Sequence, residues 1–184
     1  MAPSKITLPV SKYLHVMTSS ILFVCLGNIC RSPLVEAVAR RRFADAGLSI
    51  EVDSCGTGGW HVGQGADERS IRVAEEAGYR LRDHRVRQLA VDDFRRFDAL
   101  LAMDDDNLAV LRASSPPQYR DRAILFLDAA GLDEYAPPIV PDPYYEDLDA
   151  FRHVLKLAEQ GVDGLIERLR RGEPLVAPSR AATR

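Results

Sequence analysis

Short apolar runs alternate with amphipathic segments along most of the chain. The first run, Ile21 to Cys25 (ILFVC), stops at a turn that contains glycine. Similar runs lie at 49–53, 97–103 and 123–127. Short apolar runs that are rich in branched and aromatic residues are typical of strands buried on both faces. Four strands are therefore predicted.

The segments between these runs carry apolar residues at helical spacing. Ser32 can cap the first helix, Pro33 suits its first turn, and Gly47 ends it. Further helical segments are predicted at 67–77, 92–96, 104–112 and 148–170. Strands that alternate with helices indicate right-handed crossovers and a parallel sheet covered on both faces. The expected fold class is therefore α/β, a three-layer α/β/α sandwich.

One domain accounts for most of the chain. We expect residues 1–19 to be an N-terminal extension, 20–171 the domain and 172–184 a C-terminal tail. Within the domain, residues 128–147 contain four prolines and follow neither a helical nor a strand period. An irregular loop of that length inside a compact domain usually has a function.

Composition and charge argue against nucleic acid and membranes as partners. The net charge is −3 with both signs interspersed, so no continuous basic face is expected for nucleic acid. No run approaches the roughly 20 apolar residues that a membrane-spanning helix needs, and no secretory signal is evident. Three cysteines do not indicate a disulfide framework. We expect a cytoplasmic monomer that binds neither membrane nor nucleic acid.

The candidate chemistry lies in the loop that connects the first strand to the first helix. Backbone amides of such a loop, together with a helix N-terminus, can surround an oxyanion such as phosphate. Gly27 and Asn28 suit a positive φ, and the planar fork of Arg31 can bind two phosphate oxygens. The predicted phosphate-binding residues are Leu26, Gly27, Asn28, Ile29, Cys30, Arg31 and Ser32.

Cys25, at the end of the strand, is the candidate nucleophile. A cysteine at such a position is most often an inert core residue. Here the anion-binding loop should also favour a thiolate at Cys25, and a thiolate can attack phosphorus. The hydroxyl of Ser32 could stabilise the same sulfur when it leaves.

The segment Val24 to Pro33 (VCLGNICRSP) resembles the signature of the low-molecular-weight protein tyrosine phosphatases. The similarity extends in order and spacing over about residues 20–170, through further matches at 53–63, 84–88, 97–107 and 140–145. The resemblance implies a four-stranded parallel sheet of order 2-1-3-4. It also implies hydrolysis of phosphotyrosine through a phosphocysteine without a cofactor. The histidines are scattered and the cysteines lack a paired spacing, so no metal is predicted.

The resemblance also implies a general acid, Asp142, in the DPYY pattern of the long loop. Without it, Asp142 followed by Pro143 would be interpreted as turn chemistry. The resemblance further implies walls for the phosphotyrosyl ring at Trp60, Tyr144 and Tyr145. Supporting hydrogen bonds to the phosphate loop are implied at Asn28, Ser54 and His84.

Three alternatives remain open at this point. A phosphoarginine phosphatase of the same fold typically carries threonine where Ile29 stands. A thiol-dependent arsenate reductase needs further cysteines downstream, and none follows Cys55. A catalytically silent phosphate-binding module would be expected to lack one of the three catalytic candidates, Cys25, Arg31 and Asp142. The favoured interpretation is a protein tyrosine phosphatase with phosphotyrosine proteins as substrates and inorganic phosphate as a ligand.

Overall fold

The computed structural model describes residues 18–132 and 134–176. Four strands pair in parallel in the order β2-β1-β3-β4. Their bounds are β1 Ser20–Cys25, β2 Glu51–Gly56, β3 Ala99–Ala102 and β4 Ala123–Leu125. The predicted sheet and its strand order are therefore confirmed.

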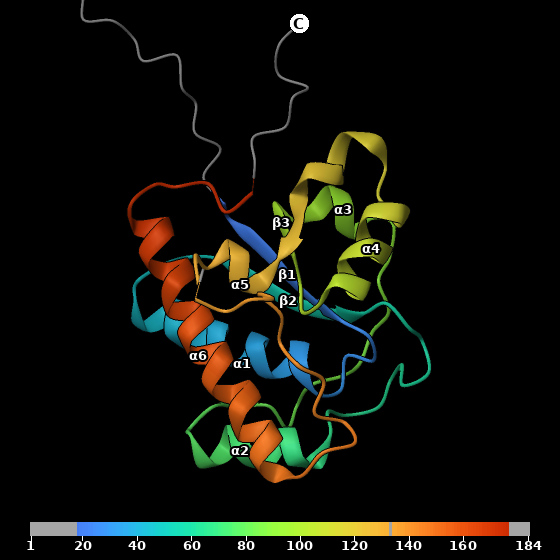
Figure 1. The fold of residues 1–184 in the computed structure, drawn as a ribbon, viewed down its shortest axis with the longest axis vertical. Coiled ribbons are helices and arrows are strands. Elements are labelled where there is room, and N and C mark those ends of the chain that lie inside the picture. Colours follow the sequence, from blue (N-terminus) through green and yellow to red (C-terminus); the bar gives the residue numbers. More distant parts are fainter. Residues whose placement is uncertain (1–17, 133, 177–184) are drawn as a thin grey trace, which may run out of the picture.

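Helices cover both faces of this sheet, as Figure 1 shows. The helical elements are α1 Arg31–Asp45, α2 Glu68–Glu76, α3 Asp93–Arg96, α4 Asp105–Ser114, the 3-10 helix η1 Pro117–Arg122, α5 Phe126–Ala129 and α6 Leu148–Arg170. The long helix α6 packs against α1 on one face, and α3 and α4 lie on the other. Helix α2 packs against α1 and α6. The predicted three layers are confirmed.

The central strand β1 explains why its sequence is apolar throughout. Ile21 and Phe23 belong to the core under α1 and α6, whereas Leu22 and Val24 belong to the core under α3 and α4. Side chains alternate across a strand, so burial on both faces requires a continuous apolar run. All four side chains are fully buried.

Some predicted element boundaries were wrong. Strand β2 begins at Glu51 and continues to Gly56, into the segment expected as a loop. Strand β4 ends at Leu125 because the chain turns into the short helix α5. Helix α1 begins at Arg31, with Cys30 in the N-cap position and no side-chain cap. Ser32 therefore lies inside the helix and is not its cap.

The long proline-containing segment is attached to the sheet. Between α5 and α6, the described residues 130–132 and 134–147 form no helix or strand. Val140 is fully buried, and its amide donates to the carbonyl of Met103, just beyond β3, at 2.8 Å. This contact brings the segment to the carboxyl ends of the strands.

The chain stays packed beyond α6. Leu175 is buried in the core, past the expected start of the tail at 172. Residues 1–17 of the predicted extension and 177–184 of the predicted tail lie outside the described residues. The domain boundaries remain predictions. Among the helices that the structure describes, none combines the length and apolar character needed to span a bilayer.

Asp98, which precedes β3, connects the starts of the two inner strands, β1 and β3. Its Oδ2 accepts hydrogen bonds from the amides and hydroxyls of Ser19 and Ser20 at 2.9 to 3.2 Å. Burial opposes ionisation, but these donors lower the pKa of Asp98 below its ordinary value of 3.8. A lowered pKa means that the carboxylate stabilises the fold above the unfolded-state pKa and loses this effect as pH falls.

We therefore expect Asp98→Asn to lower the free energy of unfolding by about 1 kcal/mol at pH 7. The difference from the wild type should shrink when denaturant titrations are repeated near pH 3. The exposed Asp83, which pairs with Arg80 at 3.3 Å, provides the control Asp83→Asn. A difference that persists unchanged at acid pH would contradict the role of the Asp98 charge.

Candidate active site

The site forms where β1 ends and the chain passes into α1. Cys25 is the last residue of β1 and lies opposite Gly56 of β2. A Cβ atom at position 56 would come within 2.9 Å of the Leu26 carbonyl oxygen and 3.0 Å of the Gly58 carbonyl oxygen. A glycine is required there because the loop after Cys25 runs so close to β2.

Asn28 organises this loop through its side chain. It adopts a φ of 54°, the left-handed conformation that asparagine tolerates better than most residues. Its Nδ2 donates to the hydroxyls of Ser32 at 2.9 Å and Ser54 at 2.8 Å. Its Oδ1 accepts from the amide of Arg87 at 3.1 Å. The buried carboxamide therefore has partners at both ends.

The backbone of Asn28 is also held on both sides. Its amide lies 3.2 Å from the sulfur of Cys25, to which it donates, and its carbonyl oxygen lies 3.0 Å from Nε2 of His84. A carbonyl oxygen can only accept, so Nε2 of His84 carries the hydrogen. The expected supporting residues Asn28, Ser54 and His84 are thus connected by hydrogen bonds, and none of them lines the pocket in front of the loop.

The sulfur of Cys25 is surrounded by donors. Besides the Asn28 amide, the hydroxyl of Ser32 lies 3.0 Å from Sγ. With Cys25 as a thiolate, both contacts become donations to sulfur, and hydrogen bonds to a charged partner are the stronger kind. The uncapped N-terminus of α1 also points its positive end at this region.

Arg31 connects the loop to two carboxylates. Its side chain is 3% exposed, with Nη1 2.5 Å from Asp104 and Nη2 2.8 Å from Asp142. Nη1 also donates to the carbonyl of Val140 at 3.2 Å. Burial would lower the pKa of Arg31, but the negative charges of Cys25, Asp142 and Asp104 raise it above its ordinary value. The guanidinium is therefore a fixed positive charge beside the sulfur.

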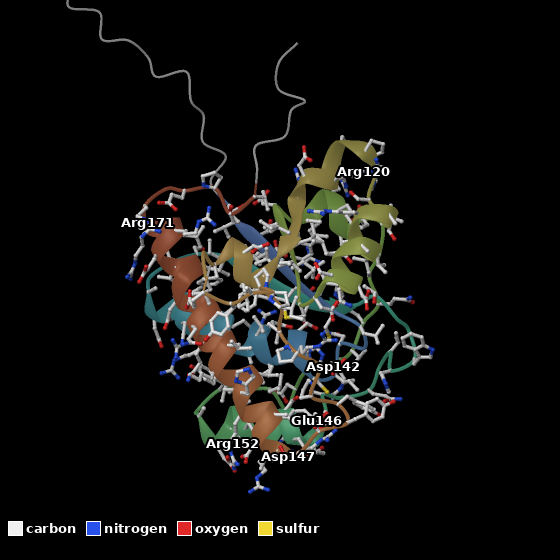
Figure 2. The ribbon with its side chains drawn as sticks, viewed as in Figure 1. Arg120, Asp142, Glu146, Asp147, Arg152 and Arg171 are labelled. Carbon is white, nitrogen blue, oxygen red and sulfur yellow. The ribbon has the colours of Figure 1, made fainter. Side chains whose placement is uncertain are left out.

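Asp142 reaches the site from the segment before α6. Figure 2 shows it on the irregular stretch that also carries Glu146 and Asp147, next to the beginning of α6. Its Oδ1 accepts from the amide of Tyr144 at 3.2 Å, so the turn chemistry of an Asp-Pro pair is also present. The side chain is 44% exposed, which leaves it open to a proton donor or acceptor.

Cys25, Arg31 and Asp142 meet around one cavity of about 270 Å³. The residues that line it are Cys25, Leu26, Gly27, Ile29, Cys30, Arg31, Trp60, His61, Asp142, Tyr144 and Tyr145. Trp60 is 72% exposed and Tyr145 is 93% exposed, so they stand at the mouth of the cavity. The rings of Tyr144 and Tyr145 meet edge to face, with centroids 4.9 Å apart.

Two residues around the site, Asp104 and Glu36, were not predicted from the sequence. Asp104, which holds Arg31, also caps α4 by accepting from the amide of Asn107 at 2.8 Å. Its position, just past the buried run of β3, was an available signal, because ligands gather at the carboxyl ends of parallel strands. Glu36 accepts from the Ser54 hydroxyl at 2.6 Å, and its position in an amphipathic helix gave no such signal.

The environments of the other two cysteines, Cys30 and Cys55, favour the protonated thiol. Burial, followed by the charge of Asp67, raises the pKa of Cys30 well above its ordinary value. Burial also raises the pKa of Cys55, against the effect of Arg87. Both thiols should stay protonated at neutral pH, so neither competes with Cys25 as the nucleophile.

Comparisons with known proteins agree with this geometry. The family model of the low molecular weight phosphotyrosine protein phosphatases matches residues 20–175. A low molecular weight protein-tyrosine-phosphatase from Streptomyces coelicolor is 44% identical over 162 residues, which cover 84% of this chain and 95% of the relative.

Solved structures show the same relationship. A protein tyrosine phosphatase from Entamoeba histolytica, with Hepes in its active site, has a TM-score of 0.78 at 37% identity, covering 84% of this chain and 99% of its own. The tyrosine phosphatase Wzb from Escherichia coli K30, in complex with sulphate, has a TM-score of 0.73 at 37% identity, covering 83% and 99%. The family match, the relative and the shared architecture together place this chain in the low molecular weight phosphotyrosine protein phosphatase family.

Proposed function

We propose that this chain is a protein tyrosine phosphatase that hydrolyses phosphotyrosine through a phosphocysteine at Cys25. The observation that carries the proposal is the position of one sulfur within reach of the Asn28 amide and the Ser32 hydroxyl. Arg31 and Asp142 line the same cavity. A nucleophile, an anion holder and a proton carrier are the three groups that phosphoryl transfer from a phenol requires.

In the first step, the Cys25 thiolate attacks phosphorus, a sulfur–phosphorus bond forms, and the bond to the phenolic oxygen breaks. Arg31 and the loop amides hold the three non-bridging oxygens, where the charge of the transition state is spread. Asp142 gives its proton to the departing phenolate. Its contact with Arg31 at 2.8 Å puts the carboxyl group within reach of an anion that Arg31 holds.

In the second step, water attacks the phosphocysteine. Asp142, now a carboxylate, accepts the proton of this water, the sulfur–phosphorus bond breaks, and inorganic phosphate leaves. The sulfur departs as a thiolate, which the Ser32 hydroxyl at 3.0 Å is placed to stabilise. The reaction needs no cofactor.

The aromatic rim supports a preference for phosphotyrosine. Trp60, Tyr144 and Tyr145 line the same cavity as Cys25, and their rings can pack against a phenyl ring. The shorter side chain of phosphoserine would bring its own backbone against this rim. Half-buried Ile29 lines the cavity where the related phosphoarginine phosphatases typically carry threonine, which favours the tyrosyl substrate.

We also propose that the protein binds phosphate, acts as a monomer and works in a reducing compartment. The sulphate complex of the Escherichia coli K30 phosphatase supports the binding of phosphate or a similar oxyanion in the loop. Action as a monomer is part of the proposal, because one copy of the chain already brings Cys25, Arg31 and Asp142 together around the cavity. A reduced Cys25 is needed for catalysis, and this requirement supports a reducing compartment such as the cytoplasm.

A panel of phosphopeptides tests the proposed function. We expect kcat/KM for a phosphotyrosine peptide to exceed that for the matched phosphoserine peptide by about 10³-fold or more, because only the longer side chain reaches the sulfur. A phosphoarginine peptide of the same sequence is the third substrate. A higher kcat/KM for the phosphoarginine peptide would contradict phosphotyrosine as the substrate but not Cys25 as the nucleophile. If none of the three peptides were hydrolysed, the proposed function would be contradicted.

A further inference from the structure

Arg69 lies in the first turn of α2 and faces the loop that carries Asp142. Its Nη2 donates to the carbonyl of Tyr144 at 3.0 Å, and its Nη1 donates to the carbonyl of Glu146 at 2.9 Å. These two carbonyls lie two and four residues after Asp142. The guanidinium therefore holds the backbone just beyond Asp142.

The Tyr144 peptide joins Arg69 to the carboxyl group of Asp142. Its carbonyl accepts from Arg69, while its amide donates to Oδ1 of Asp142 at 3.2 Å. Two hydrogen bonds thus separate the guanidinium from the carboxyl group. A shift of this backbone would move the carboxyl group with it.

The other side of Arg69 is fixed by Asp67, the N-cap of α2. Nε and Nη2 of Arg69 donate to the two carboxylate oxygens of Asp67 at 3.0 and 2.8 Å. Burial would raise the pKa of Asp67, but the hydrogen bonds from Arg69 lower it below its ordinary value. The guanidinium carbon also lies 4.3 Å from the centre of the Phe151 ring in α6. Such a cation–π contact adds a third fixed point.

The same turn of α2 holds the phosphate loop. The amide of Asp67 donates to the carbonyl of Ile29 at 2.8 Å, and the hydroxyl of Ser70 donates to the carbonyl of Cys30 at 3.3 Å. The first turn of α2 therefore contacts both the loop that follows Cys25 and the loop that carries Asp142. The first turn of α2 therefore helps to hold Cys25 and Asp142 at a fixed separation. In the proposed mechanism, these two residues act at opposite ends of one phosphorus–oxygen bond.

We propose that Arg69 is a positioning residue for Asp142, holding its carboxyl group where the phenolic oxygen departs. The inference rests on the proposed function of Asp142. A planar fork can serve two carbonyls and a carboxylate at once, whereas the point charge of a lysine cannot. A purely structural arginine would change stability and affect all substrates equally. A positioning arginine changes the step that depends on protonation.

A series of aryl phosphates with phenols of graded pKa separates these roles. Because kcat/KM covers steps only up to departure of the phenol, it reports protonation by Asp142 directly. For Asp142→Asn we expect a loss of about 10²- to 10³-fold with the most basic phenols and a much smaller loss with the most acidic. For Arg69→Lys we expect kcat/KM to fall about tenfold with the most basic phenols and less than about twofold with the most acidic ones.

The ratio between two substrates does not depend on the fraction of folded enzyme, so it remains valid if a variant is unstable. Arg72→Ala is the matched control, because Arg72 lies on the same helix, is 63% exposed and pairs with Glu76. Its profile should follow the wild type. In the Asp142→Asn background, Arg69→Lys should add less than about twofold, because residues that act through one group are not additive.

The outcomes distinguish the inference from its premise. A flat profile for Asp142→Asn would contradict the proposed acid and, with it, the role of Arg69. A steep profile for Asp142→Asn together with an equal loss on all substrates for Arg69→Lys would overturn only the positioning role. Full additivity of the two substitutions would do the same.

Discussion

Replacing Cys25 with serine is expected to lower kcat on a phosphotyrosine peptide by about 10⁴-fold or more, because an alcohol is a far weaker nucleophile than a thiolate. The donors around Sγ, the Asn28 amide and the Ser32 hydroxyl, are placed to stabilise a thiolate. Steady-state kinetics would give the loss. Rapid acid quenching of the wild type, followed by mass spectrometry, should find phosphate on Cys25.

Cys55→Ala is the matched control for this prediction. Cys55 is fully buried in β2, and its sulfur belongs to the core under α3 and α4 rather than to the cavity. The control should keep most of the activity while losing some stability. Turnover by Cys25→Ser near the wild-type rate, or a phosphoryl group trapped on another residue, would contradict the proposed mechanism.

Arg31→Lys is expected to lower kcat/KM by about 10³-fold, although it conserves the charge. The fork of Arg31 can bind two oxygens of a phosphoryl group side by side, and an ammonium group cannot reproduce that geometry. The variant should also bind phosphate and vanadate more weakly, as measured by competitive inhibition. Weaker inhibition by these oxyanions would show that the lower activity comes from the site itself and not from a smaller fraction of folded protein.

Arg41→Lys is the control for this substitution. Arg41 lies on the same helix α1, is 62% exposed and pairs with Asp45. Its kinetics should match the wild type. If Arg31→Lys stayed within about tenfold of the wild type, bidentate binding by Arg31 would not be the main source of transition-state stabilisation.

Much of the fold could be predicted from hydrophobic patterning, because the sheet is buried on both faces. The sequence of β1 is an uninterrupted apolar run, because Ile21 and Phe23 lie in the core under α1 and α6. Leu22 and Val24 lie in the core under α3 and α4. The boundaries were harder to predict. Phe126 continues the apolar run of β4 but begins α5, and apolar character alone does not distinguish a buried strand from a buried helix.

The site could be predicted where its residues lie close together in the sequence. The loop from Cys25 to Ser32 combines a strand end, a helix start and residues suited to an anion, so local patterns were enough to propose it as the candidate site. Asp142 depended on the family resemblance, because an aspartate before a proline is ordinary turn chemistry. Arg69 gave no signal, since its partners Tyr144 and Glu146 are brought to it only by the tertiary fold.

The contact between Arg31 and Asp142 spans 111 residues of sequence. On the ribosome, the anion loop is made early, whereas Asp142 and α6 emerge only near the end of the domain. Loop closure over such a separation costs entropy and comes late unless other contacts form first. A nascent chain therefore carries the candidate nucleophile for most of its synthesis without the proposed proton donor, so we expect turnover to begin only when the domain completes its folding.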